Sequence, residues 1–273
     1  MSIDVTTATF EPVTSTIGAV MSGVQLSPDL PQETIDQIAA GLREHGVLFF
    51  YDQPQMADPA VHEAFGARFG PPDLHPVSPT PLVVLDSDAY DASFDRSTGW
   101  HTDGSFEPTP PQTAILLPIV LPTVGGDTSW ASMQSVYESL SSKYQRFLDG
   151  LTALHRLTLD LADKMGAETD PTMMDAYSAV HPVVTTDPIT KRKGIYVNSN
   201  YTINIVELSD RESQSVLSFI YDQIKSPAHQ VRFRWQPHSV AMWNERITQH
   251  FGVGRYEGRR LLHRVIACGD APA

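Results

Sequence analysis

The feature of this sequence that most constrains its fold is a series of short β-type segments in the last third of the chain. These segments are rich in β-branched, aromatic and other apolar residues, and they lie at 194–197, 230–235, 239–243 and 260–268. Similar runs occur earlier, at 47–51, 82–86 and 114–121. Because the runs do not alternate regularly with helices, they argue against a parallel α/β sheet and favour a β sandwich or barrel. We expect an α+β fold with a jelly-roll core and flanking helices.

Helices are predicted where apolar residues recur at helical spacing. Residues 31–45 show this spacing and stop at Gly46, and a short helix is expected at 59–69. Two longer amphipathic helices are expected at 133–151 and 209–226, and the second opens with the capping pattern Ser-Asp-Arg-Glu. No repeat or long linker divides the chain, so we expect residues 1–273 to form a single domain.

The composition excludes several classes of function. The 273 residues carry a formal net charge of −13, whereas a nucleic-acid or anionic-membrane surface would need a basic footprint. No apolar run reaches the roughly 18 residues of a membrane span, and the first residues lack the regions of a signal peptide. Cys268 is the only cysteine, which excludes intramolecular disulfides and Cys-rich zinc or iron–sulfur sites. We expect a cytoplasmic protein that binds neither nucleic acid nor membrane.

A candidate metal site begins with His101 and Asp103. On a strand, residues two apart point to the same face, so both side chains can reach one ion. A divalent metal needs a third protein ligand, and the best candidate is His250, at the end of a strand-like segment near the C-terminus. Two histidines and one carboxylate form the facial triad of non-haem Fe(II) oxygenases, which leaves positions open for a keto acid and O₂. The His-x-Asp spacing alone also occurs by chance, since the chain has 10 histidines.

Arg260 and Arg264 lie four residues apart in the last β-type segment. In a strand this spacing places both on one face, roughly 13 Å apart, while His263 faces the other side as a packing residue. A guanidinium does not lose its proton, so inside a barrel it needs an anion beside it. The pair suggests one site for the distal carboxylate of a keto acid and another for an acidic group of the substrate. The alternative is that this face meets solvent and both arginines lie on the surface.

A series of motifs runs through nearly the whole chain. The clearest of them are FGARFG at 65–70, LHPV at 74–77, WHTDGSF at 100–106, GGDT at 125–128, HPVV at 181–184, AMW at 241–243, TQH at 248–250 and RRLLHR at 259–264. In sequence and in order they resemble the taurine dioxygenase family, which includes alkylsulfatase and phenoxyalkanoate dioxygenase members. So many separate matches in the right order are not expected by chance.

The resemblance implies a double-stranded β-helix (jelly-roll) fold and Fe(II) bound by His101, Asp103 and His250. It also implies that Thr128 and Arg260 bind the distal carboxylate of 2-oxoglutarate. The family reaction uses O₂ to convert 2-oxoglutarate to succinate and to hydroxylate the substrate. When the hydroxylated carbon carries a sulfonate, sulfate ester or ether oxygen, the product breaks at its C–S or C–O bond. Because Asp103 is a carboxylate and not a small residue, no ligand position is freed for halide, and hydroxylation is favoured over halogenation.

The same resemblance implies a small anionic organic substrate of the sulfonate, alkyl sulfate or aryloxyalkanoate type. His75 and Arg264 match positions that contact its acidic group, the backbone of Gly104 lies beside them, and Phe106 forms a pocket wall. The alternative for His75 is a buried histidine with a local hydrogen bond. An insert at about 157–180, which matches the family poorly, takes the place of the mobile lid that carries specificity. Family members are commonly dimers or tetramers, which implies a homo-oligomer.

Some positions depart from the family pattern. Ser78 stands where the taurine enzyme has a tyrosine, and Trp-Asn-Glu-Arg at 243–246 replaces the usual Trp-Asp-Asn-Arg. These departures indicate the same chemistry on a substrate other than taurine. A biosynthetic hydroxylase of an amino-acid derivative or other carboxylate metabolite would use the same residues. A non-catalytic metal-binding jelly-roll module would not need Thr128 and Arg260, and a zinc hydrolase is disfavoured because no His-Glu-x-x-His pattern is present.

Overall fold

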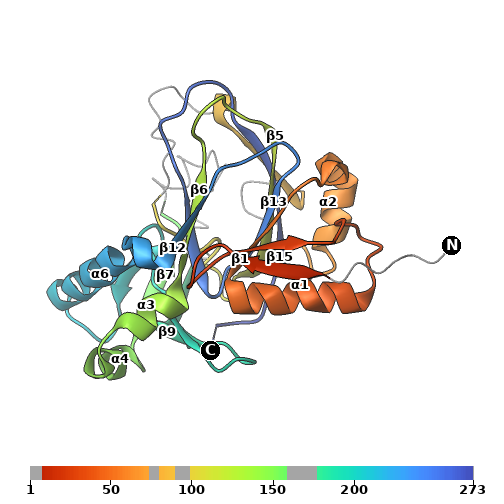
Figure 1. Cartoon of the computed structure of the whole chain (residues 1–273). Coiled ribbons are helices and arrows are strands. Elements are labelled where there is room, and N and C mark those ends of the chain that lie inside the picture. The colour runs from red at the N-terminus through yellow and green to blue at the C-terminus, as the bar shows by residue number, and fades with distance from the viewer. Residues whose placement is uncertain (1–7, 74–79, 90–98, 159–176, 273) are drawn as a thin grey trace.

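The computed structural model describes residues 8–73, 80–89, 99–158 and 177–272 of the chain (Figure 1). His75 and Ser78 lie outside these ranges, as does most of the predicted insert at 157–180. None of the helices within the ranges combines the length and the apolar character that crossing a membrane requires.

A seven-stranded sheet forms the largest layer. Its strands, in order across the sheet, are β1 (Thr9–Pro12), β2 (Ala19–Ser22), β3 (Val47–Phe50), β13 (Val240–Asn244), β5 (Pro111–Val120), β15 (Leu261–Cys268) and β4 (Leu82–Asp86). The pairs of β13 with β3 and β5, and of β15 with β5 and β4, are antiparallel, whereas β2 and β3 run parallel. Segments from the start, the middle and the end of the chain therefore meet in one layer.

Smaller antiparallel sheets complete the β structure. One of them consists of β12 (Gln230–Phe233), β6 (Thr128–Ser132) and β14 (Thr248–Gly252), a second of β11 (Thr202–Ile205), β7 (Thr152–Arg156) and β8 (Ser178–Pro182), and a third of β10 (Lys193–Ile195) and β9 (Val184–Thr186). The sheet that contains β6 and β14 bears most directly on function, because Thr128 begins β6 and His250 lies within β14.

Aromatic side chains fill the space between the seven-stranded sheet and the β6 sheet. Trp130 of β6 and Trp243 of β13 are fully buried, and their ring centroids are 5.5 Å apart. Phe49 of β3 stacks on Phe233 of β12 with a centroid distance of 4.3 Å. All four residues belong to one hydrophobic cluster. The two sheets therefore pack face to face around a shared core, as in a β sandwich.

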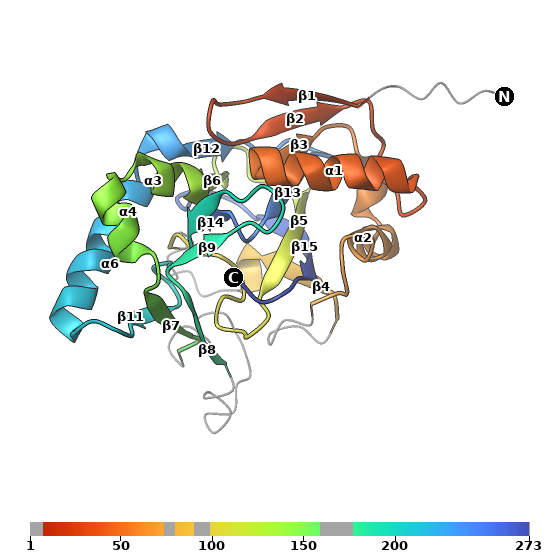
Figure 2. The same ribbon diagram turned by 90° about the horizontal axis from the view of Figure 1, so that it is seen from below.

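Helices cover the outside of the sheets at two places. α1 (Gln32–His45) and α2 (Pro59–Gly66) lie beside the seven-stranded sheet (Figure 2). At the other end of the molecule are α3 (Met133–Ser139), α4 (Ser142–Leu148) and α6 (Asp210–Ile224). Three short 3-10 helices complete the described elements: η1 (Pro54–Ala57), η2 (Ser87–Ala89) and η4 (Pro227–His229).

Most predicted elements are present, and the capping box that opens α6 is formed by Ser209 and Glu212. The prediction of one helix over 133–151 was wrong. Leu140 is extended, with φ −74° and ψ 149°, and the Ser141 side chain accepts a hydrogen bond from the Tyr144 backbone N–H to start a second helix. Ser132 caps the first helix in the same way. The strands that were missed mix polar with apolar residues; they are β1, β2, β6, β7, β8, β9 and β11.

Candidate active site

His101 and His250 form a backbone pair across two neighbouring segments. Each N–H donates to the carbonyl oxygen of the other residue, with N–O distances of 3.1 and 2.8 Å. This is the reciprocal pair of an antiparallel bridge, and it leaves the two imidazole centroids 4.3 Å apart. His250 lies within β14, not at a strand end as predicted. The fold thus brings together two imidazoles that are far apart in the sequence.

Asp103 reaches the two histidines through a turn. The strand expected at His101–Asp103 is reduced to the single bridge at His101, and the chain then turns, with φ 59° at Gly104. Asp103 Oδ1 lies 3.4 Å from His101 Nε2, and Asp103 Oδ2 lies 3.9 Å from His250 Nε2. One ligand atom from each of the three residues lies within 4.8 Å of the others. One metal ion can bridge this spacing.

The donor set fits divalent iron. His101 Nδ1 lies 2.7 Å from Gly99 O, which places the proton on Nδ1 and leaves the Nε2 lone pair for a metal. Burial alone would raise the pKa of Asp103, but the charge of Arg264 and the two histidines hold it well below its ordinary value. Burial lowers the pKa of His250 to about 3. At neutral pH the site therefore offers an ionised carboxylate and neutral imidazole at His250, which are the forms that bind metals.

Arg264 lies inside the site, not on the surface. Its Nη1 donates to Asp103 Oδ2 at 2.7 Å, and the residue is only 7% exposed. Arg264 Nε is buried and has no hydrogen-bond partner within the described ranges. The guanidinium therefore holds the Asp103 carboxylate on one side, while its Nε has no acceptor among the described residues.

Arg260 and Thr128 converge as expected for a shared ligand. Arg260 Nη2 lies 3.3 Å from Thr128 Oγ1, and Arg260 Nε donates to Gly126 O at 2.8 Å. Trp235 Nε1 donates to the same Thr128 hydroxyl at 3.1 Å. Arg260 precedes β15, whose pairing with β5 shifts in register just after Leu261. The prediction that both arginines lie within one regular strand was therefore wrong, although each guanidinium donates a hydrogen bond to a distant part of the chain.

The remaining predicted residues lie near the cluster of His101, Asp103 and His250 or outside the described ranges. Phe106 is fully buried, and its ring centroid is 5.0 Å from that of Tyr201. Gly104 has no room for a side chain, since a Cβ there would lie 2.6 Å from Pro111 Cδ. The structure does not describe His75, so its predicted contact with substrate remains a prediction.

Three acidic residues near the cluster were not predicted as site residues. Glu245 is fully buried, and its Oε2 accepts a hydrogen bond from the Asp103 backbone N–H at 3.1 Å. Burial, and then the negative charge of Asp73, raise the pKa of Glu107 to about 7. The only sign of Glu245 in the sequence is its departure from the family tetrapeptide. Asp73 and Glu107 give no local signal.

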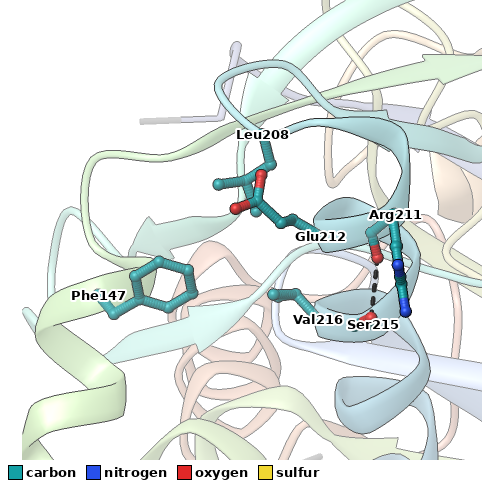
Figure 3. Close-up of a pocket in the computed structure, with 6 residues that line it drawn as sticks. All are labelled: Phe147, Leu208, Arg211, Glu212, Ser215 and Val216. Carbon is teal, nitrogen blue, oxygen red and sulfur yellow. Dashed lines mark hydrogen bonds between the residues drawn. The ribbon is translucent and has the colours of Figure 1, made fainter.

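A surface depression lies elsewhere, between α4 and α6 (Figure 3). Its volume is about 350 Å³, and it is lined by Phe147, Leu208, Arg211, Glu212, Ser215 and Val216. The lining includes none of the predicted site residues, and the close-up shows one hydrogen bond there, from Ser215 Oγ to Arg211 O at 2.8 Å. The candidate chemistry therefore stays with the His101 cluster.

Over residues 9–266 the sequence matches the taurine catabolism dioxygenase TauD, TfdA family. The chain belongs to this family. It is 32% identical to an α-ketoglutarate-dependent sulfate ester dioxygenase of Pseudomonas putida, over 96% of this chain and 89% of that protein. It is 31% identical to an alkylsulfatase of Acinetobacter baylyi, over 94% of this chain and 84% of that protein. The crystal structure of a taurine dioxygenase from Burkholderia xenovorans has a TM-score of 0.81 at 31% identity, and the match covers 97% of this chain and 92% of that one.

As a TauD/TfdA family member, the protein is a 2-oxoglutarate (α-ketoglutarate)-dependent dioxygenase that uses Fe(II), 2-oxoglutarate and O₂. The family expected from the sequence motifs is confirmed, and so is a mixed fold of sheets and helices like that of TauD-type structures. The cluster of His101, Asp103 and His250 fits the iron that this chemistry requires.

Proposed function

We propose that this dioxygenase hydroxylates a small organic anion of the sulfonate, alkyl sulfate or aryloxyalkanoate type. When the hydroxylated carbon bears the sulfur or oxygen substituent, the product then breaks at the C–S or C–O bond. The observation that carries the proposal is the buried Arg264 guanidinium, which contacts Asp103 and keeps Nε without a partner in the described part of the chain. A guanidinium with a spare donor is suited to an oxyanion. The names of the sulfate ester dioxygenase and the alkylsulfatase support the same substrate class.

We assign Fe(II) to His101, Asp103 and His250. When bound, Fe(II) supplies the activation of O₂ that couples succinate formation to hydroxylation. Thr128 and Arg260 bind the distal carboxylate of 2-oxoglutarate, since the hydroxyl and the guanidinium converge at 3.3 Å. This pair is held by backbone and indole contacts that do not depend on the ligand, so it offers the carboxylate a preformed site.

The substrate's acidic group is assigned to Arg264, to His75 and to the backbone beside Gly104, with Phe106 as a wall of the pocket. Because the chain carries a formal net charge of −13, attraction for an anion must be local. Arg264 provides this attraction at the position where the substrate must approach the metal.

We also propose a specific fold, domain organisation, location and oligomeric state. The face-to-face packing of the seven-stranded sheet and the β6 sheet supports a double-stranded β-helix. Residues 1–273 form a single domain, and the insert at about 157–180 is the lid over the substrate. The protein is cytoplasmic and forms a homodimer or homotetramer, which light scattering on the purified protein tests.

A succinate-production screen tests the substrate class. The enzyme is incubated with Fe(II), 2-oxoglutarate, O₂ and a panel of sulfonates, alkyl sulfates, aryloxyalkanoates and N-acyl amino acids. Succinate formed with one of the first three classes, together with release of sulfite, sulfate or a phenol, supports the proposal. Turnover restricted to N-acyl amino acids would instead support the biosynthetic hydroxylase. If anaerobic Fe(II) and 2-oxoglutarate give no visible charge-transfer absorption, the assignment of the co-substrate site is wrong.

A further inference from the structure

Glu245 lies next to two of the proposed metal ligands, Asp103 and His250. It occupies the turn between β13 and β14 and is fully buried. Its backbone N–H donates to Gln112 O at 2.9 Å. Its Oε1 accepts from Trp243 Nε1 at 2.6 Å, and its Oε2 accepts from the Asp103 backbone N–H at 3.1 Å. Both carboxylate oxygens are thereby held in place, and one of them steadies the turn that carries Asp103.

Among the described residues, His250 does not make the Nδ1 hydrogen bond that a metal-binding histidine normally makes. A histidine that binds through Nε2 carries its proton on Nδ1, and that N–H almost always meets a carboxylate, a carbonyl or a water. His250 Nδ1 is buried and has no hydrogen-bond partner in the described part of the chain. Glu245 Oε2 lies 4.0 Å away from it. A small movement of the ring toward Glu245 would bring this pair within hydrogen-bond distance.

We propose that Glu245 is a positioning residue of the metal centre, which accepts the Nδ1–H of metal-bound His250 and the backbone N–H of Asp103. The inference rests on the proposed function, in which His250 and Asp103 are ligands. The partner of His101 Nδ1 is the neutral Gly99 carbonyl, at 2.7 Å. The two histidines are therefore unequal donors, because a carboxylate partner raises the basicity of an imidazole ligand more than a carbonyl does.

This role explains why Glu245 stands where the family tetrapeptide Trp-Asp-Asn-Arg has an asparagine. An asparagine in place of Glu245 has one amide oxygen to accept an N–H, but it is shorter by one methylene and has no second acceptor oxygen. It could not hold Trp243, Asp103 and His250 together. Glu245 therefore links the element that carries Asp103 to the strand that carries His250.

Cobalt binding tests the inference, because Co(II) is redox-stable and reports on its ligands by spectroscopy. In the Co(II)-loaded enzyme, ¹H NMR should show two exchangeable, paramagnetically shifted imidazole N–H signals, from His101 and His250. Glu245→Gln should shift or broaden the His250 signal only and weaken Co(II) binding about 10- to 100-fold. Gln249→Met is the matched control, since Gln249 is fully buried next to His250 and donates to Val197 O at 2.7 Å. This control should keep both signals and the Co(II) affinity.

Further variants distinguish misfolding of Glu245→Gln, failure of the inference about Glu245 and failure of the metal assignment. If Glu245→Gln does not fold, Glu245→Asp and Glu245→Asn replace it, since they match in length and only Asp keeps two acceptor oxygens, and the Asp variant should bind Co(II) about 10-fold more tightly. Equal affinity in that pair, or an unchanged His250 signal in Glu245→Gln, overturns the inference. His250→Ala tests the proposed function separately. If His250→Ala binds Co(II) as wild type does, the metal assignment itself is wrong, whatever Glu245 does.

Discussion

Arg264 Nη1 lies 2.7 Å from Asp103 Oδ2, so the arginine assigned to the substrate also contacts the carboxylate assigned to the metal. Asp103 Oδ1 lies 3.4 Å from His101 Nε2, and Oδ2, which Arg264 contacts, lies 3.9 Å from His250 Nε2. An anion that binds Arg264 shares the guanidinium with Asp103. In the proposed site, substrate recognition and the carboxylate assigned to the metal are therefore electrostatically coupled through one side chain.

The first prediction concerns substrate affinity. Arg264→Gln removes a charge-assisted hydrogen bond of about 1.5–3 kcal/mol, so the KM for an anionic substrate should rise about 10- to 100-fold. The KM for 2-oxoglutarate should stay near the wild-type value, because Arg260 is unchanged. Steady-state kinetics with each of the two substrates varied in turn measures both effects. The reverse pattern would mean that the two arginines have exchanged roles.

The second prediction concerns the buried ion pair. Asp103→Ala should abolish hydroxylation and leave Arg264 buried without its anion, at a cost of about 3–5 kcal/mol in the free energy of unfolding without metal. Urea unfolding of the metal-free protein measures this cost. In the double variant Asp103→Ala/Arg264→Met no unpaired charge remains, so part of the lost stability should return without any activity. Retained turnover in Asp103→Ala would remove Asp103 from the ligand set.

The third prediction uses two glycines with similar backbone conformations. Gly126 has φ +72°, and a Cβ there would lie 3.0 Å from Arg260 Cδ, whereas Gly150 has φ +88° and nothing within 4 Å of its Cβ position. Alanine at either position should cost about 1–2 kcal/mol of stability through backbone strain. Only Gly126→Ala should displace Arg260 and raise the KM for 2-oxoglutarate, on the order of 10- to 100-fold. An equal change of KM in Gly150→Ala would show that strain alone causes it.

The sequence sufficed to name the three residues of the His101–Asp103–His250 cluster, because each belongs to a short motif that aligns with a known family. It did not predict their geometry. Asp103 converges on the histidines through the turn at Gly104, which the assumption of a continuous strand does not foresee. The Arg264–Asp103 contact joins residues 161 positions apart. Such a contact depends on which strands become neighbours, and local residue patterns do not contain that information.

Helix periodicity failed at one place for a related reason. The apolar spacing continues through 133–151, but Ser141 provides a cap that starts α4 after an extended Leu140. The spacing of apolar residues shows which face of a helix is buried, but it does not show whether one helix continues or a second helix begins. Glu245 shows the same limit within the site, since its role follows from contacts with Asp103 and Trp243 that only the fold creates.

The fourth prediction concerns acid stability and His62 of α2, which is fully buried. Burial, with a smaller effect of His263, lowers the pKa of His62 from 6.5 to about 3. The unfolded chain therefore binds a proton below pH about 6.5 that the folded protein does not bind until pH about 3. Stability contributed by neutral His62 is complete above pH about 6.5 and is lost as the pH falls, by about 1.4 kcal/mol per pH unit.

His62→Leu should remove this dependence. When the pH falls from about 7.5 to about 5, wild type should lose about 2 kcal/mol more of its free energy of unfolding than the variant loses. Urea unfolding at both pH values measures this difference. His238→Asn is the control, because His238 is exposed and asparagine tolerates its φ of 61°. The control should follow the wild-type pH dependence. If His62→Leu does so too, the unfolded and folded states bind the same number of protons at residue 62, and burial does not keep His62 neutral.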